Sequence, residues 1–184
     1  GPRGAAELGL GLVESAARQG HAGAQGHLAA LCRAGHGPAG LAPDPARFRF
    51  WAQKAASAGD PFSQAMMGDA HFHGLDGVQR DLPKAFRYYE AAANQGHAEA
   101  CYSVGVMLYH GFGVEQSYED SFRYYQYAAE RGAARAWRNL AAMHAQGLGV
   151  PRSEDTARHI LKVMGDAIRQ ADQEEEEKAG SNGF

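Results

Sequence analysis

A five-residue phrase, Ala-Ala-x-x-Gly, occurs four times in this chain. Its copies start 39, 37 and 36 residues apart and occupy Ala16–Gly20, Ala55–Gly59, Ala92–Gly96 and Ala128–Gly132. A period of this length is typical of a supersecondary unit that cannot bury its apolar face alone and must stack on copies of itself. The chain is therefore predicted to be a repeat protein, which constrains its architecture far more than its chemistry.

Loops and helix starts recur at fixed distances from this phrase. Paired glycines followed by valine occur at 111–114 and 147–150, and with one extra residue at 74–78. Paired glycines permit positive-φ turns that side chains with a Cβ resist, so these segments are predicted loops. Three residues after each valine, and at the equivalent place in the first unit, stands a residue that caps helix N-termini: Asp81, Ser117, Ser153 and Asp44.

After each cap the apolar residues follow a helical spacing. Ala85, Tyr88, Tyr89 and Ala92 share one face at i, i+3, i+4 and i+7. The closing glycine of each phrase ends that helix, and a second helix starts almost at once. The pattern predicts nine helices, at about 5–19, 22–34, 45–58, 61–73, 82–95, 98–110, 118–131, 134–146 and 154–171. No segment alternates as a strand does, so the predicted fold is all-α.

Alignment on the closing glycine places Gly68, Gly105 and Ala141 at one position of the helix that follows that glycine, the first helix of each unit. Each follows an apolar residue: Met67, Val104 and Leu140. Small residues that recur at one position predict that two helices approach closely there.

The segment Gly77–Gly96 combines the end of a glycine loop, an Asp cap and the pattern Lys-Ala-Phe-x-Tyr-Tyr-x-x-Ala-Ala-x-x-Gly. This combination resembles the Sel-1-like repeat, a relative of the tetratricopeptide repeat, and the resemblance extends from about Ala16 to Ala171. It implies a right-handed α/α solenoid of about four helix pairs. It also implies an adaptor or scaffold with no catalytic residue.

The resemblance divides the chain into one solenoid domain, 1–172, and an acidic, low-complexity tail, 173–184. The solenoid is expected to contain a leading half-repeat, 5–20, and units at about 21–59, 60–96, 97–132 and 133–171. The half-repeat is either an N-terminal cap or the remainder of a unit that begins upstream. Gly35–Pro38 opens a loop about three residues longer than the others, and Ser121 replaces the usual alanine, so the curvature is not expected to be uniform.

Composition limits the classes of partner. The 184 residues are 45% hydrophobic and carry a net charge of −3, too near neutrality to favour nucleic acid or an anionic membrane. No segment has the roughly 20 apolar residues that span a bilayer. Cys32 and Cys101 lie in different units and are expected to be separate buried thiols. We expect a soluble or peripherally docked protein, in the cytoplasm or the interior of a mitochondrion or plastid.

The first helix of each unit is expected to line a concave face, as in related helix-pair repeats. Register then assigns a protein-binding groove to Phe62, Asp69, Phe72, Glu99, Tyr102, Val106, Tyr109, Arg135 and Arg138. Aromatic rings beside arginine are typical of interface hot spots. The alternative is that these rings pack against the second helices as part of the core.

Other candidate sites are weaker. His71 and His73 point about 200° apart on a helix and cannot share a metal ion, and no carboxylate or cysteine cluster accompanies His73 and His110. The glycine loops lack the third glycine and the preceding strand of a dinucleotide site. The tyrosine pairs of the second helices are interpreted as core rather than as a base-stacking surface. We therefore predict no catalytic residue, no metal and no cofactor.

Two functions agree with these sequence features. The chain is expected to be a non-catalytic scaffold, held as an accessory or assembly subunit within a larger multiprotein complex. The alternative is a transient adaptor that binds a peptide segment of client proteins in signalling or quality control. A hydrolase function lacks a nucleophile motif.

Overall fold

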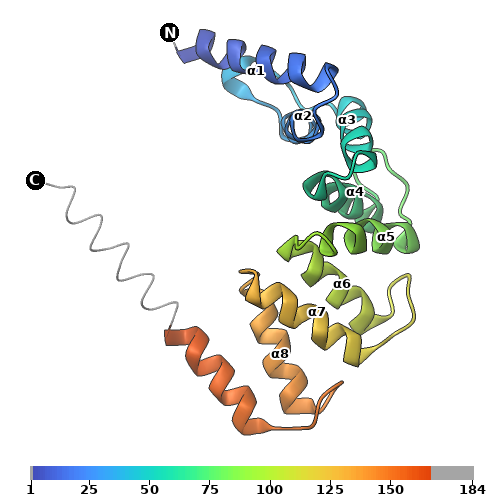
Figure 1. Ribbon diagram of the computed structural model, residues 1–184, viewed down its shortest axis with the longest axis vertical. Coiled ribbons are helices and arrows are strands. Elements are labelled where there is room, and N and C mark those ends of the chain that lie inside the picture. Colours follow the sequence, from blue (N-terminus) through green and yellow to red (C-terminus); the bar gives the residue numbers. More distant parts are fainter. Residues whose placement is uncertain (1, 167–184) are drawn as a thin grey trace, which may run out of the picture.

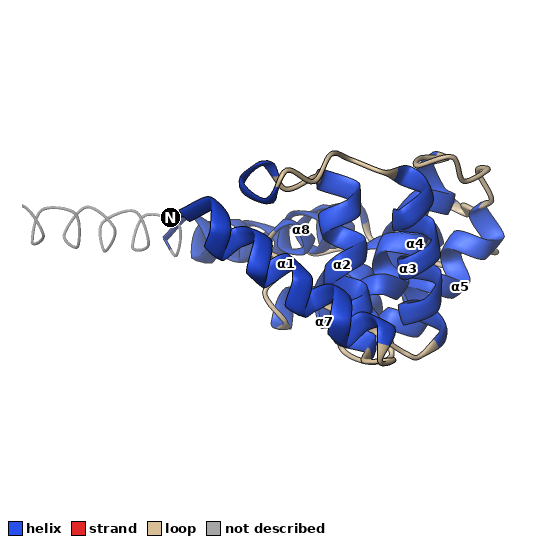
Figure 2. Cartoon of the chain, turned by 90° about the horizontal axis from the view of Figure 1, so that it is seen from above, coloured by secondary structure: helices blue, strands red, loops and turns tan. Residues whose placement is uncertain are grey.

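The computed structural model describes residues 2–166, with side chains from residue 4 onwards. The described helices follow one another along an arc, from α1 (Pro2–Arg18) to a helix over residues 154–166 (Figure 1). Viewed from above, the same residues form helices joined by loops, with no strand (Figure 2). The acidic tail predicted at 173–184 lies outside the described residues.

The helices after α1 form four consecutive pairs. The pairs are α2 (Ala22–Ala34) with α3 (Pro45–Ser57), α4 (Pro61–His73) with α5 (Leu82–Ala93), α6 (Ala98–His110) with α7 (Tyr118–Glu130), and α8 (Arg135–Gln146) with the helix over 154–166. We call the first member of each pair the A helix and the second the B helix. Helix α1 occupies the place of a B helix before the first pair. Residues 2–166 thus contain nine α-helices and no strand, as predicted.

Two details differ from the sequence prediction. Helix α1 begins three residues earlier than predicted, and the long first loop contains a short 3₁₀ helix, η1 (Gly37–Ala39). An isolated bridge between His36 and Leu41 closes that loop. The end predicted for the last helix, at 171, lies beyond the described residues.

The Ala-Ala-x-x-Gly phrase forms the junction between each B helix and the next A helix. In every copy, the residue after the glycine donates its N–H to the carbonyl of the first alanine. The four bonds are His21 to Ala16 (3.2 Å), Asp60 to Ala55 (3.0 Å), His97 to Ala92 (3.2 Å) and Ala133 to Ala128 (2.9 Å). This six-to-one bond defines a Schellman motif, and the glycines have φ between 83° and 98°. The phrase therefore recurs because it ends a helix and sets the direction of the next one.

The carbonyl of the second alanine in the phrase is also satisfied, by a side chain of the following A helix. Gln25 Nε2 donates to Ala17 at 3.0 Å, and Gln64 Nε2 donates to Ala56 at 3.3 Å. In the next unit Cys101 Sγ fills this role toward the Ala93 carbonyl, at 3.7 Å. Cys101 and Cys32 are both buried free thiols, so Cys101 contributes a hydrogen bond as well as apolar volume.

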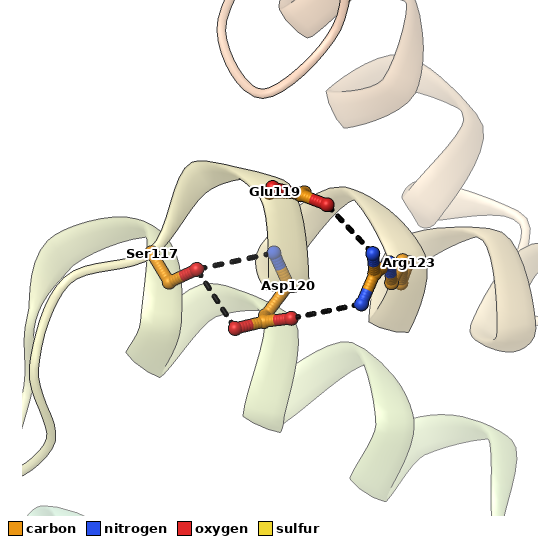
Figure 3. A network of polar contacts seen from close by, with 4 residues as sticks. All are labelled: Ser117, Glu119, Asp120 and Arg123. Carbon is orange, nitrogen blue, oxygen red and sulfur yellow. Dashed lines mark hydrogen bonds and ion pairs between the residues drawn. The ribbon is translucent and has the colours of Figure 1, made fainter.

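The predicted N-caps are confirmed. Asp44, Asp81, Ser117 and Ser153 each accept a hydrogen bond from a backbone N–H in the first turn of the B helix that follows. At α7 the cap is part of a larger network (Figure 3). There Ser117 Oγ accepts from Asp120 N at 3.2 Å and donates to Asp120 Oδ2 at 2.9 Å, while Arg123 pairs with Asp120 and Glu119. Side chains therefore satisfy donors that a helix start leaves without partners.

At the Gly68 and Gly105 positions, where two helices were predicted to approach closely, the absence of a side chain makes room for an aromatic ring. A Cβ on Gly68 would lie 2.6 Å from the ring of Tyr89, and one on Gly105 would lie 2.7 Å from the ring of Tyr125. Each glycine accommodates a tyrosine ring from the B helix of its own pair. Ser121 also belongs to this contact, since its Oγ donates to the Gly105 carbonyl at 2.8 Å.

Candidate protein-binding groove

A hollow of about 670 Å³ crosses the A helices of the solenoid. We call this hollow the concave groove. Its lining comes mainly from α2, α4 and α6, with Arg135 contributed by α8: Gly23, Gly26, His27, Ala30, Asp60, Phe62, Ala65, Met66, Asp69, Tyr89, His97, Glu99, Ala100, Ser103 and Arg135. Because each A helix contributes residues at the same register positions, the groove is a consequence of stacking the repeats.

Phe62 is a large apolar residue in the lining of the groove, and 67% of its surface is exposed to solvent. Its ring lies edge-on to the ring of His97, with centroids 4.9 Å apart. His97 is held in turn because its Nδ1 accepts a hydrogen bond from Ala100 N at 3.1 Å. The exposed ring therefore stands beside a side chain that is itself fixed to the start of α6.

Arg135 connects α8 to α6 along the groove wall. Its guanidinium lies 4.2 Å from the centre of the Tyr102 ring and forms an ion pair with Glu99. The Tyr102 hydroxyl accepts from Asn139 Nδ2, also on α8, at 3.5 Å. Both members of the ion pair are more than half exposed, so a partner could compete for either charge.

The floor of the groove carries a phenol from a B helix. Tyr89 of α5 reaches between the A helices, and its hydroxyl donates to Asp69 Oδ1 at 2.7 Å. Burial raises the pKa of Tyr89 above its ordinary value, and the nearby Asp69 carboxylate raises it further. Tyr89 therefore stays protonated and holds the Asp69 side chain in place.

A smaller hollow of about 220 Å³ adjoins the concave groove. It shares Asp69, Tyr89, Ser103 and Arg135 with the groove and adds Phe72, His73, Tyr102 and Val106. The two hollows thus form one continuous surface along α4, α6 and the start of α8.

The structure brings together seven of the nine residues that the sequence assigned to the groove. Phe62, Asp69, Phe72, Glu99, Tyr102, Val106 and Arg135 line one or both hollows. Tyr109 and Arg138 line neither: the Tyr109 ring packs edge-on against Tyr118, with centroids 5.1 Å apart, and Arg138 is exposed on α8. A role of these residues in protein binding stays a prediction.

The four aromatic residues assigned to the groove differ in how far they are buried in the core. Phe62 is exposed, whereas Phe72, Tyr102 and Tyr109 are half-buried and pack against the core that surrounds Tyr89 and Tyr125. A half-buried ring contributes one face to the fold and leaves an edge for a partner.

Sequence reasoning missed the part of the groove that α2 supplies. Gly23, Gly26 and Ala30 stand three, six and ten residues after their closing glycine, as Phe62, Ala65 and Asp69 do one unit later. Extending the register by one repeat would have found them. The contribution of Tyr89 had no such signal, because it depends on how far a B-helix ring reaches between two A helices.

The other sequence candidates have structural roles. His71 is buried, its ring stacks on that of Tyr88 with centroids 5.6 Å apart, and burial lowers its pKa. His73 is exposed, and within residues 2–166 no three metal-ligating side chains cluster. Tyr89 and Tyr125 are buried core residues, as predicted. None of the helices described is both long and apolar enough to cross a membrane.

Comparison with known proteins identifies the repeat. The Sel1 repeat family matches four consecutive segments, 22–60, 61–97, 98–132 and 134–162. The chain belongs to the Sel1 repeat family. Sel1 repeats are protein-interaction motifs, and this fold is typically a non-catalytic interaction scaffold.

Two solved structures share the Sel1 solenoid. A protective antigen of uropathogenic Escherichia coli, described as having an SLR fold, superposes with a TM-score of 0.79 at 31% identity, over 88% of this chain and 34% of that one. A Sel1 repeat protein from Oxalobacter formigenes superposes with a TM-score of 0.75 at 26% identity, over 81% of this chain and 60% of that one.

Curated relatives match over shorter stretches. Human protein sel-1 homolog 2 is 34% identical over 71 residues, 38% of this chain and 10% of that protein. Chitin synthase regulatory factor 3 of Schizosaccharomyces pombe is 42% identical over 55 residues, 30% of this chain and 6% of that protein. The chain therefore spans only a small part of these relatives.

Proposed function

We propose that this Sel1 repeat solenoid is a scaffold that binds a partner protein in its concave groove, as an accessory or assembly subunit of a larger complex. The proposal treats residues 1–172 as one solenoid domain, with the acidic segment 173–184 as a separate tail. The observation that carries it is the groove itself, because Phe62 is an exposed ring on a wall that four A helices build together.

The groove suits a protein partner for a physical reason. Its walls are already fixed, by the Tyr89–Asp69 hydrogen bond and by the stacking of Arg135 on Tyr102. A preformed surface lowers the cost of ordering side chains on binding, so more of the contact energy appears as affinity. A rigid solenoid can also contact several subunits at once.

A transient adaptor is the second candidate. The volume of the groove, about 670 Å³, would hold a short segment of an extended peptide. A stable subunit would use the groove and further surfaces together, whereas an adaptor would need the groove alone.

The first test replaces Phe62 by alanine in the full chain. Phe62 is two-thirds exposed, so this change should leave the fold intact while it removes the apolar contact that the groove offers. We expect partners captured by the tagged chain from its own source to bind about tenfold more weakly, as hot-spot rings do when truncated. Tyr127→Ala is the matched control, since Tyr127 is likewise an exposed aromatic residue but does not line the groove. Equal capture by the wild type and Phe62→Ala would reject the groove as the binding surface.

The captured material also separates the two functions. A fixed, stoichiometric set of subunits that survives high salt and elutes as one species in gel filtration is expected for a subunit of an assembly. A variable, salt-sensitive set of clients would instead support the adaptor.

A further inference from the structure

A further hollow, of about 750 Å³, lies between the B helices α3 and α5 and the adjoining side of α4. We call it the basic hollow. It shares no lining residue with the concave groove, since α4 contributes Met67 and His71 here and Phe62, Ala65, Met66 and Asp69 there. The basic hollow is therefore a separate surface of the molecule.

The charge of this hollow is of one sign. Arg49, Lys54 and Lys84 line it, and no aspartate or glutamate does. Within residues 2–166 none of the three cations forms an ion pair. Arg49 donates to the backbone carbonyl of Asp76, whose carboxylate pairs with Arg33 instead. The nearby Asp81 carboxylate is engaged as the cap of α5, where it accepts from Lys84 N at 2.9 Å. Such a cluster on a chain of net charge −3 is a local feature.

Apolar groups stand among these charges. Phe50 is 59% exposed, and Met67 and Val78 complete an apolar part of the lining. The Lys54 ammonium lies 5.9 Å from the centre of the Phe50 ring and 5.7 Å from that of Trp51. At the equivalent position of the next two units stand Arg87 and Arg123, so the exposed ring is particular to the first unit.

We propose that the basic hollow binds an acidic peptide segment that carries an aromatic or aliphatic residue among its carboxylates. The cations would pair with Asp and Glu side chains, while the apolar residue would pack on Phe50 and the half-buried Val78. Charge complementarity of this kind steers association and selects the partner. A nucleic acid fits less well, because its affinity depends on many phosphate contacts along a basic stripe, and three cations around a hollow provide few.

The first experiment selects phage-displayed random peptides on the immobilised full chain and, in parallel, on the chain with Lys54→Glu and Lys84→Glu. A chain with Arg158→Glu and Lys162→Glu is the matched control, since these cations are exposed on the helix over 154–166, outside the hollow. We expect peptides rich in Asp and Glu with an aromatic or aliphatic residue to be enriched on the wild type and the control, and lost on the Lys54 and Lys84 variant. Circular dichroism verifies that each variant is folded.

The second experiment measures fluorescence anisotropy of a labelled glutamate-rich peptide that contains one Phe and one Leu. We expect binding to weaken at least about tenfold between about 0.05 M and 0.3 M NaCl, because the contacts are exposed charges. Phe50→Ala should weaken it about tenfold as well, as for a hot-spot ring, and the same peptide with glutamine in place of glutamate should not bind.

Several results would overturn the proposal. One is enrichment of neutral or basic peptides, or of none. Another is enrichment that does not change with Lys54→Glu and Lys84→Glu. A third is binding of phosphatidylserine vesicles or single-stranded DNA that depends on these lysines while the acidic peptide does not bind. Because Phe62→Ala leaves the basic hollow unchanged, failure here is distinguishable from failure of the concave groove.

Discussion

Replacing Gly105 by alanine is expected to destabilise the solenoid, although alanine is the better helix former. Glycine within a helix costs about 0.5–1 kcal/mol relative to alanine, which alone would make the change favourable. The new Cβ would lie 2.7 Å and 2.8 Å from Cδ1 and Cε1 of Tyr125, closer than carbon atoms pack. Tyr125 is only 2% exposed, so its ring has no free space to enter. Overpacking of this kind costs about 1–3 kcal/mol, which leaves a net loss of about 1 kcal/mol.

Gly11→Ala is the matched control for this change. Gly11 also lies inside a helix, α1, but nothing stands within 4 Å of its Cβ position. Alanine should therefore stabilise the chain there by about 0.5–1 kcal/mol. Urea denaturation followed by circular dichroism measures both midpoints. The two variants should differ by about 2 kcal/mol, provided that the denaturation slopes are equal.

A double substitution tests the cause. In the fourth unit the positions of Gly105 and Tyr125 are occupied by Ala141 and Leu161, a pair without the ring. The double variant Gly105→Ala with Tyr125→Leu should therefore be more stable than the sum of the two single changes predicts. If Gly105→Ala stabilises the chain as much as Gly11→Ala does, the proposed fit between glycine and ring is wrong.

Three further outcomes are expected. Asp81→Ala removes the hydrogen bond to Lys84 N at 2.9 Å and should lower the free energy of unfolding by about 1 kcal/mol, measured by urea denaturation; an unchanged midpoint would contradict the cap. Burial raises the pKa of Tyr125 to about 12 and also raises that of Tyr89, so the folded chain keeps protons that the unfolded chain loses near pH 10. The contribution of these two phenols to stability should thus be complete below about pH 10 and be lost above it. The tyrosinate absorbance of Tyr125 and Tyr89 should appear only when the chain unfolds; ionisation of all the tyrosines near pH 10 would contradict this. Because burial raises the pKa of Cys32 and Cys101, both should react slowly with a thiol reagent until the chain unfolds, and fast reaction of the native chain would refute their burial.

The repeat and its helices could be predicted because they depend on short-range geometry. The residue after the closing glycine donates its N–H to the carbonyl of the first alanine, a bond that spans six residues, and each N-cap acts within three residues. Such interactions involve neighbours along the chain, so the same residues must recur wherever a helix ends or starts. The period, the helices and the A-helix register of the groove follow from them.

Which side chains meet across the repeats depends on tertiary packing. Arg135 and Glu99 are 36 residues apart, and Tyr88 and Gln53 are 35 residues apart; each contact depends on how one helix pair stacks on the next. Sequence register placed Tyr109 and Phe62 in the same groove, whereas in the structure Tyr109 packs against Tyr118 and lines neither of the two hollows. The basic hollow has no repeating sequence signature, because α3, α4 and α5 each contribute different residue types to it. Bonds between near neighbours recur with the repeat, so the amino-acid sequence specifies a solenoid of stacked Sel1 helix pairs. The surfaces form where side chains distant in sequence come together, so they depend on how the helices pack.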